Sequence, residues 1–133
     1  MNYQDIKNEA EKKYTVLSDK VGLFWAFSNE QFAEGKAKNP IAKGEKYTSI
    51  GAGGYLPSKN VQAFIDGQKA IEKWRKAAVK SAKADKVILY ELNNYEAFYT
   101  GGIDDAMEVL ADLGYSREQV REVYNNNREF ALN

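Results

Sequence analysis

Carboxylate, amide and phenol side chains gather in one short segment of this chain. Glu91–Glu96 contains two carboxylates, two amides and a phenol, and Phe98–Gly102 adds a phenol and a hydroxyl. Carboxylates can move protons or bind a divalent cation. However, Glu91 and Glu96 are five residues apart, which separates them by about 140° around a helix. The segment therefore does not supply a catalytic carboxylate pair by itself.

A Mg²⁺-dependent hydrolase or transferase would need further acids beside this segment. Asp104 and Asp105 follow it closely and could extend a site built on Glu91 and Glu96. Adjacent acids at the start of a helix more commonly interact with the backbone N–H groups and the helix dipole. The Mg²⁺-dependent enzyme is therefore one of the alternative hypotheses.

The chain contains no histidine and no cysteine in its 133 residues. Histidine is the usual general base near neutral pH, and cysteine is the usual thiolate nucleophile. Catalytic triads, Cys–His pairs, ordinary zinc sites and disulfides are therefore excluded. We expect a protein that is not an enzyme and that has no cofactor or metal.

A row of lysines is the clearest charge pattern. They follow one another at steps of four, three, four and three residues, and on a helix they would fall within roughly 80° of arc. The row predicts a binding surface for nucleic acid or for an acidic protein, and its members are Lys69, Lys73, Lys76, Lys80 and Lys83. The alternative is an ordinary solvated face.

The neutral net charge hides two segments of opposite sign. Residues 59–86 hold eight basic and three acidic residues, whereas residues 91–122 hold two basic and eight acidic residues. The two segments could neutralise each other in the fold, or the basic one could face a polyanion. Nine tyrosines add side chains that suit contact surfaces.

Hydrophobic periodicity predicts an α+β fold in one domain, residues 1–133. Residues 3–17 have an amphipathic helical pattern, and strands are expected near 22–28, 46–51 and 53–57 in a small antiparallel sheet. A long helix near 60–83 is expected to pack on that sheet, with several shorter helices. Val87–Leu92 fits either a helix or a strand, although Asp85 as a cap favours a helix.

Glycines and hydroxyl residues mark the ends of these elements. Gly51–Gly54 follows a predicted strand but lacks the spacing of a phosphate-binding loop, so a hairpin or bulge is favoured. Ser28 with Gln31 and Ser116 with Gln119 are capping-box patterns that predict two helix starts.

The N-terminal residues are polar, and no apolar run is long enough to cross a membrane. We therefore expect neither a signal peptide nor a membrane partner, and a cytoplasmic location. The oligomeric state is left open.

Three stretches resemble a known group of sequences: Phe24–Phe32 with Gly35, Ile50–Tyr55, and Glu91–Gly101. They are similar to a family of small uncharacterised proteins encoded by phages and mobile elements of gut-type bacteria. In that family the last stretch often ends in Tyr-Thr-Gly-Asp, whereas position 102 here is Gly.

The resemblance implies an accessory protein that binds host machinery, with an anti-defence or anti-CRISPR inhibitor as its sharpest form. Its partner would be a host protein or a ribonucleoprotein, and direct binding of RNA or DNA through the lysine row is the main alternative. If the shared motif marks a site, its residues are Asn29, Phe32, Glu91, Asn94, Glu96 and Tyr99. The same residues could instead form a buried polar network.

Overall fold

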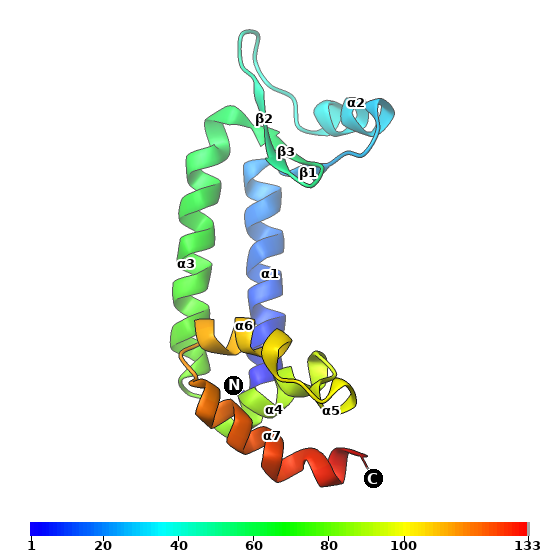
Figure 1. The fold of residues 1–133 in the computed structure, drawn as a ribbon. Coiled ribbons are helices and arrows are strands. Elements are labelled where there is room, and N and C mark those ends of the chain that lie inside the picture. The colour runs from blue at the N-terminus through cyan, green and yellow to red at the C-terminus, as the bar shows by residue number, and fades with distance from the viewer. Residues whose placement is uncertain (133) are drawn as a thin grey trace. The chain divides into compact units, whose positions relative to one another are not determined.

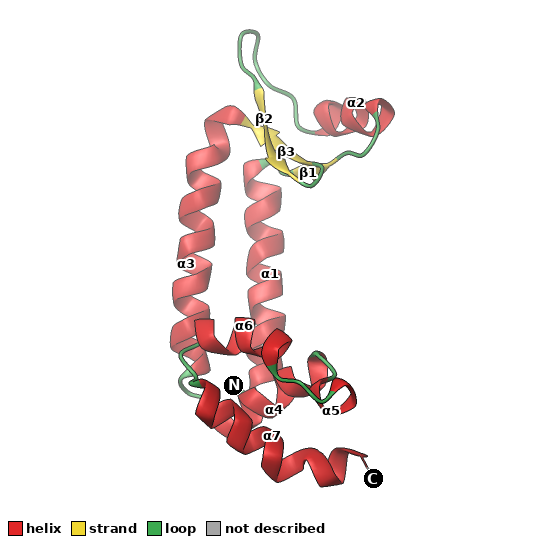
Figure 2. Ribbon diagram, viewed as in Figure 1, coloured by secondary structure: helices red, strands yellow, loops and turns green. Residues whose placement is uncertain are grey.

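The computed structural model describes residues 1–132, and the side chains of residues 1–128. Helices form most of it and the strands are short (Figures 1 and 2), which confirms the predicted α+β class. Within the described part, the elements run α1 (Tyr3–Val21), β1 (Phe24–Trp25), α2 (Asn29–Lys38), β2 (Tyr47–Gly51), β3 (Gly54–Pro57), the 3₁₀ turn η1 (Ser58–Asn60), α3 (Val61–Val79), α4 (Ala84–Asn94), α5 (Ala97–Thr100), α6 (Asp104–Asp112) and α7 (Arg117–Leu132).

Residue contacts divide the chain into two compact units, which are described separately below. The first unit comprises residues 1–7 and 75–133, and the second comprises residues 8–74. The chain passes from one unit to the other within α1 and again within α3. A single domain therefore stays a prediction.

A three-stranded antiparallel sheet lies in the second unit, with β3 between β1 and β2. The β2–β3 hairpin turns at Ala52 and Gly53, which both have positive φ, at 51° and 87°. Two such residues in succession match the right-handed twist of a tight hairpin. The register shifts between Ser49 and Gly51, so the glycine-rich segment is a hairpin with a bulge, as predicted.

The first strand is shorter than predicted. The expected strand near 22–28 was interpreted as buried on both faces, but only Phe24 and Trp25 are strand residues, and Trp25 and Phe27 are exposed. The reason is that β3 begins at Gly54, and only one further backbone bond, from Ala26 N to Gly53 O at 2.8 Å, extends the pairing.

Both predicted capping boxes begin helices. The Ser28 hydroxyl accepts a bond from Gln31 N at 3.1 Å, and the Gln31 side chain accepts one from Phe27 N at 2.8 Å. Ser116 caps α7 in the same way, accepting from Gln119 N at 3.1 Å. The two serine bonds satisfy backbone N–H groups that the first helical turn leaves without a partner, and the Gln31 bond satisfies the N–H of Phe27 just before the helix.

The long helix near 60–83 ends earlier than predicted, at Val79. The Ser81 hydroxyl donates to Ala78 O at 2.6 Å, and Ser81 N and Ala82 N bond to carbonyls three residues back. These bonds tighten the last turn and compete with helix continuation. Ala84 then starts α4, which settles the ambiguous Val87–Leu92 segment as helix.

The long helix packs on the sheet, as predicted, and it also contacts α1. Within the second unit, Gly67 of α3 faces the Leu17 side chain of α1, and a Cβ at Gly67 would lie 2.4 Å from Leu17 Cδ1. Phe64 reaches the sheet, where it joins the core cluster of Val21 and Leu56. The helix therefore contacts α1 at Gly67 and packs on β3 at its start.

The first unit has a separate core. Ring packing joins α5 to α7, because Phe98 and Tyr124 stack with their centroids 5.2 Å apart and their planes 9° apart. The residues that are completely buried here come from α1, α4, α6 and α7: Ile6, Val87, Ile88, Leu92, Ala106, Leu110 and Val120.

The helix α2 is attached to the sheet at one contact that tolerates no side chain. Gly35 lies under the Phe24 ring, so a Cβ there would lie 2.1 Å from Phe24 Cδ2. We predict that Gly35→Ala lowers the free energy of unfolding by about 2 kcal/mol, because overpacking forces the ring or the helix to move. Urea unfolding measures this. Gly102→Ala is the control, since its Cβ would meet nothing within 4 Å, and equal losses in the two variants would contradict the prediction.

Candidate functional site

The Glu91 carboxylate of the predicted motif is buried in a polar network of the first unit. Glu91 is 1% exposed. It accepts bonds from the Tyr3 hydroxyl at 3.1 Å, from Lys7 Nζ at 3.3 Å and from Asn94 Nδ2 at 3.3 Å. The network therefore ties the start of α1 to α4.

Electrostatics in this network keep Tyr3 protonated. Burial, followed by the nearby Glu91 carboxylate, raises the pKa of the Tyr3 phenol above its ordinary value of 10.0. Lys7 supplies the opposite charge that a buried carboxylate needs, and it also lies over the Tyr90 ring at 5.0 Å. Three donors and one positive charge thus compensate the burial of the Glu91 carboxylate.

The other residues of the motif do not join Glu91. Asn29 and Phe32 belong to α2 in the second unit. Glu96 is exposed in a left-handed turn between α4 and α5, and Tyr99 is 91% exposed. The buried-network interpretation thus describes Glu91, to which the exposed Asn94 donates from the surface, while Glu96 and Tyr99 lie on the surface without joining it.

The lysine row is split by the early end of α3. Lys69 and Lys73 are exposed on the part of α3 in the second unit. In the first unit, Lys76 pairs with Asp112 at 3.4 Å, and Lys80 and Lys83 follow the end of the helix. The five lysines therefore do not share one helix.

Two of the acids of the Mg²⁺ hypothesis, Glu91 and Asp104, have other partners. Asp104 forms an ion pair with Arg117, whose hydrogen bond and charge lower the pKa of the Asp104 carboxyl. In the part of the chain that the structure describes, no group of three or more acids could hold a metal ion. The hypothesis gains no support from these residues.

An exposed aromatic surface in the second unit was not predicted from the sequence. Trp25 is 54% exposed and Phe27 is 76% exposed. Each ring lies over a glycine of the hairpin. A Cβ at Gly53 would be 2.4 Å from Phe27 Cε1. A Cβ at Gly54 would be 2.7 Å from Ile50 Cγ1 and 3.0 Å from Trp25 Cζ3. We call Trp25, Phe27 and Ile50 the hairpin aromatic surface.

An apolar groove adjoins the hairpin aromatic surface. It has a volume of about 490 Å³, and its walls come from α1, β1, β2 and α3. None of its lining side chains is charged; they are Tyr14, Ser18, Leu23, Trp25, Ile50, Val61, Phe64, Ile65 and Gln68. The groove and the surface beside it therefore suit contact with apolar side chains.

Comparison with known proteins places the chain in a family. The model of a family of unknown function (DUF7659) matches residues 3–129. The chain belongs to DUF7659. No curated protein and no solved structure matches it.

The DUF7659 match covers both units, so it includes the Glu91 network and the hairpin aromatic surface. Among the described residues, no helix combines the length and the apolar character needed to cross a membrane.

The sequence contained a signal for the hairpin aromatic surface, since Trp25 and Phe27 alternate with Phe24 and Ala26 along the strand. Side chains alternate between the two faces of a strand, so this pattern places Phe24 and Ala26 on one face and Trp25 and Phe27 on the other.

The buried Tyr3 phenol beside Glu91 should make the free energy of unfolding depend on pH in the alkaline range. Above about pH 10, Tyr3 loses its proton in the unfolded chain but keeps it in the folded one, so stability falls as pH rises. Tyr3→Phe removes this contribution, and its free energy of unfolding should fall less steeply than that of the wild type between pH 9 and about 11. Urea titrations at fixed pH measure both curves, and parallel curves would contradict the prediction.

Proposed function

We propose that this protein is a non-enzymatic accessory protein that acts by occupying the surface of a partner protein through the hairpin aromatic surface. One observation carries the proposal: Trp25 and Phe27 are held over glycines yet remain largely exposed. Exposing two aromatic rings is unfavourable in water, and burial against a partner would recover that free energy.

The fixed position of the rings favours binding. A ring already seated on a glycine loses little conformational freedom when a partner covers it. Tryptophan is also enriched among the residues that dominate protein–protein binding energies. Trp25 is therefore the expected anchor, with Ile50 and Phe27 around it.

The groove defines the chemistry of the partner. Because its walls lack charged side chains, the partner should insert an apolar side chain there. Ser18 and Gln68 supply polar groups that could bond to the partner backbone at the edge.

The biological setting is part of the proposal. The resemblance of Phe24–Phe32 and Glu91–Gly101 to phage and mobile-element proteins supports an accessory role against host machinery. An anti-CRISPR-like inhibitor that covers a host protein or ribonucleoprotein is the sharpest form of this role.

Binding should depend on Trp25 and Ile50. Immobilised wild-type protein is used to capture partners from a lysate of the native host, and the captured protein is then purified and titrated. We expect Trp25→Ser/Ile50→Ser to weaken binding about thirtyfold, because truncation of a central anchor costs about 2 kcal/mol.

Val16→Ser is the matched control, since Val16 is 66% exposed on α1 and lies outside the groove. Circular dichroism verifies that each variant is folded. Equal affinity of the double variant and the wild type for the purified partner would contradict the proposal, as would a wild type that binds no purified partner.

A second candidate is direct binding of RNA or DNA by Lys69 and Lys73. Both are exposed, and no carboxylate in the described part of the chain lies within ion-pair distance of either. Tyr47 and Tyr55 lie elsewhere in the same unit, and both rings pack against Phe24 and Phe32. Support for nucleic-acid binding therefore comes from Lys69 and Lys73 and not from stacking on tyrosine.

Salt dependence tests the second candidate. With a labelled twenty-nucleotide RNA, the slope of log K against log salt should become shallower by about 1.4 in Lys69→Gln/Lys73→Gln, because two phosphate contacts are lost. Fluorescence polarisation provides the affinities, and Lys12→Gln/Lys20→Gln is the control. A flat salt response of the wild type, or no binding at low salt, would reject nucleic-acid binding.

A further inference from the structure

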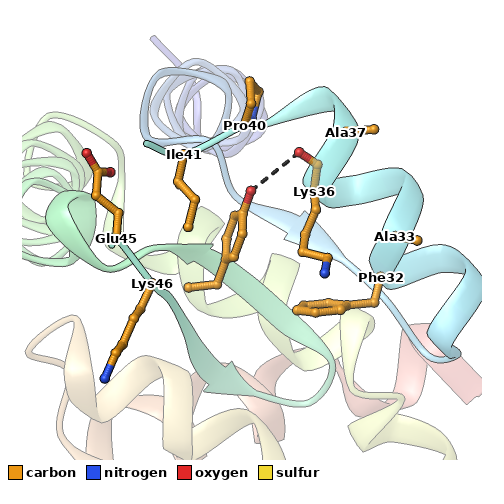
Figure 3. A pocket seen from close by; sticks show the side chains of 9 residues that line it. Phe32, Ala33, Lys36, Ala37, Pro40, Ile41, Glu45 and Lys46 are labelled. Atoms are coloured by element: carbon orange, nitrogen blue, oxygen red, sulfur yellow. Dashed lines mark hydrogen bonds between the residues drawn. The ribbon is translucent and has the colours of Figure 1, made fainter. Parts of the chain in front are cut away.

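A second cavity lies between α2 and β2, on the side of the sheet where α2 packs (Figure 3). It is shallow and widely open to solvent, with a volume of about 820 Å³. Lys36 runs from α2 across the Phe32 ring, and Ile41 projects from the segment that joins α2 to β2. We call this cavity the α2–β2 pocket.

The walls of the α2–β2 pocket are held in place by specific contacts. The Tyr47 hydroxyl donates to Lys36 O at 3.3 Å and to Asn39 O, which fixes β2 against the end of α2. The Phe32 and Tyr47 rings meet at 70° with centroids 6.1 Å apart. A preformed apolar floor therefore exists before any partner binds.

The charges around this floor are positive. Lys36 Nζ lies 4.9 Å from the centre of the Phe32 ring, and the exposed Lys46 lines the pocket from the β2 side, where its side chain extends away from that ring (Figure 3). Glu45 also lines the pocket, but its carboxylate pairs with Lys59 at 3.2 Å. The Lys36 ammonium thus lies on the apolar floor and the Lys46 ammonium lies at the outer edge of the pocket, and neither has an ion-pair partner in the described residues.

We infer that the α2–β2 pocket binds an acidic peptide segment of a partner protein, with an apolar side chain on the Phe32–Ile41–Tyr47 floor and carboxylates at Lys36 and Lys46. Charge complementarity selects this occupant, because an apolar side chain alone would leave both cations without partners. The pocket is separate from the hairpin aromatic surface, since Tyr47 packs on Phe24, and the neighbouring Trp25 points to the opposite face of the strand.

The geometry favours a peptide over a nucleic acid. Stacking of a base requires an open ring face. Here the Lys36 ammonium lies over Phe32, and Tyr47 meets the rings of Phe24 and Phe32 edge-on. The cations can still bind carboxylates in this arrangement.

A displayed library of random nine-residue peptides tests the inference. The full-length protein is panned against the library, and the most enriched peptide is synthesised with a fluorescent label. We expect the enriched pool to place Asp or Glu within two positions of an apolar residue. We also expect Lys36→Glu/Lys46→Glu to weaken binding of the labelled peptide at least about tenfold, because two attractions become repulsions.

Three further variants make the result specific. Lys12→Glu/Lys20→Glu reverses two other lysines, and Lys20 matches Lys36 because each lies in the last turn of its helix. This control and Trp25→Ser/Ile50→Ser should bind the acidic peptide with wild-type affinity. Ile41→Ser leaves both cations in place but removes part of the apolar floor, and it should weaken binding severalfold.

The inference is overturned by a pool without excess acid, by no enrichment at all, or by equal affinity of Lys36→Glu/Lys46→Glu and the wild type. It is also overturned if the wild type binds labelled single-stranded RNA but no peptide, and Lys36→Glu/Lys46→Glu loses the RNA binding. Circular dichroism verifies the folding of every variant, so loss of structure is distinguished from loss of the site.

Discussion

The second unit depends on one recurring contact, in which a large side chain occupies the space that a Cβ would fill on a glycine. The closest of these contacts sets the position of α2, because Phe24 lies directly on Gly35. The others position the hairpin side chains and bring α1 close to α3: Phe27 lies on Gly53, Ile50 and Trp25 lie on Gly54, and Leu17 lies on Gly67. Since protein interiors are close-packed, an added methyl group at such a point must displace its neighbour. These side chain–glycine contacts set the positions of α2, of the β2–β3 hairpin and of both candidate binding surfaces.

The two units differ in what their polar and aromatic groups accomplish. In the first unit, Glu91 is satisfied by Tyr3, Lys7 and Asn94, and its network joins two helices. In the second unit, aromatic side chains are fixed at the surface or beside lysines. Groups that are fully satisfied inside a fold contribute to structure, whereas fixed groups left at the surface are available to a partner. The functional proposals therefore rest on the second unit.

Local signals in the sequence predicted the start of helices and the hairpin. Ser28 and Ser116 each cap a helix through a backbone N–H three residues on, an interaction between near neighbours in the chain. The predicted length of β1 was wrong because that length depends on where its partner β3 begins, about thirty residues later in the chain. The predicted end of α3 was also wrong, because the Ser81 hydroxyl competes for Ala78 O and the helix stops before it. The lysine row is therefore divided between α3 and the residues that follow it. Glu91 was identified as a candidate, but its partners Tyr3 and Lys7 are more than eighty residues away, and no spacing rule brings them together.

Mobility of the Trp25 ring tests the central claim most directly. In a Trp74→Phe background Trp25 is the remaining tryptophan, and time-resolved fluorescence anisotropy reports the motion of its ring alone. A ring seated on Gly54 should show only the slow tumbling of the protein, and Gly54→Ala should add a fast nanosecond component while the fold persists. A fast component of equal amplitude with and without the Gly54→Ala change would contradict the account, because the exposed ring would then not be held by the glycine.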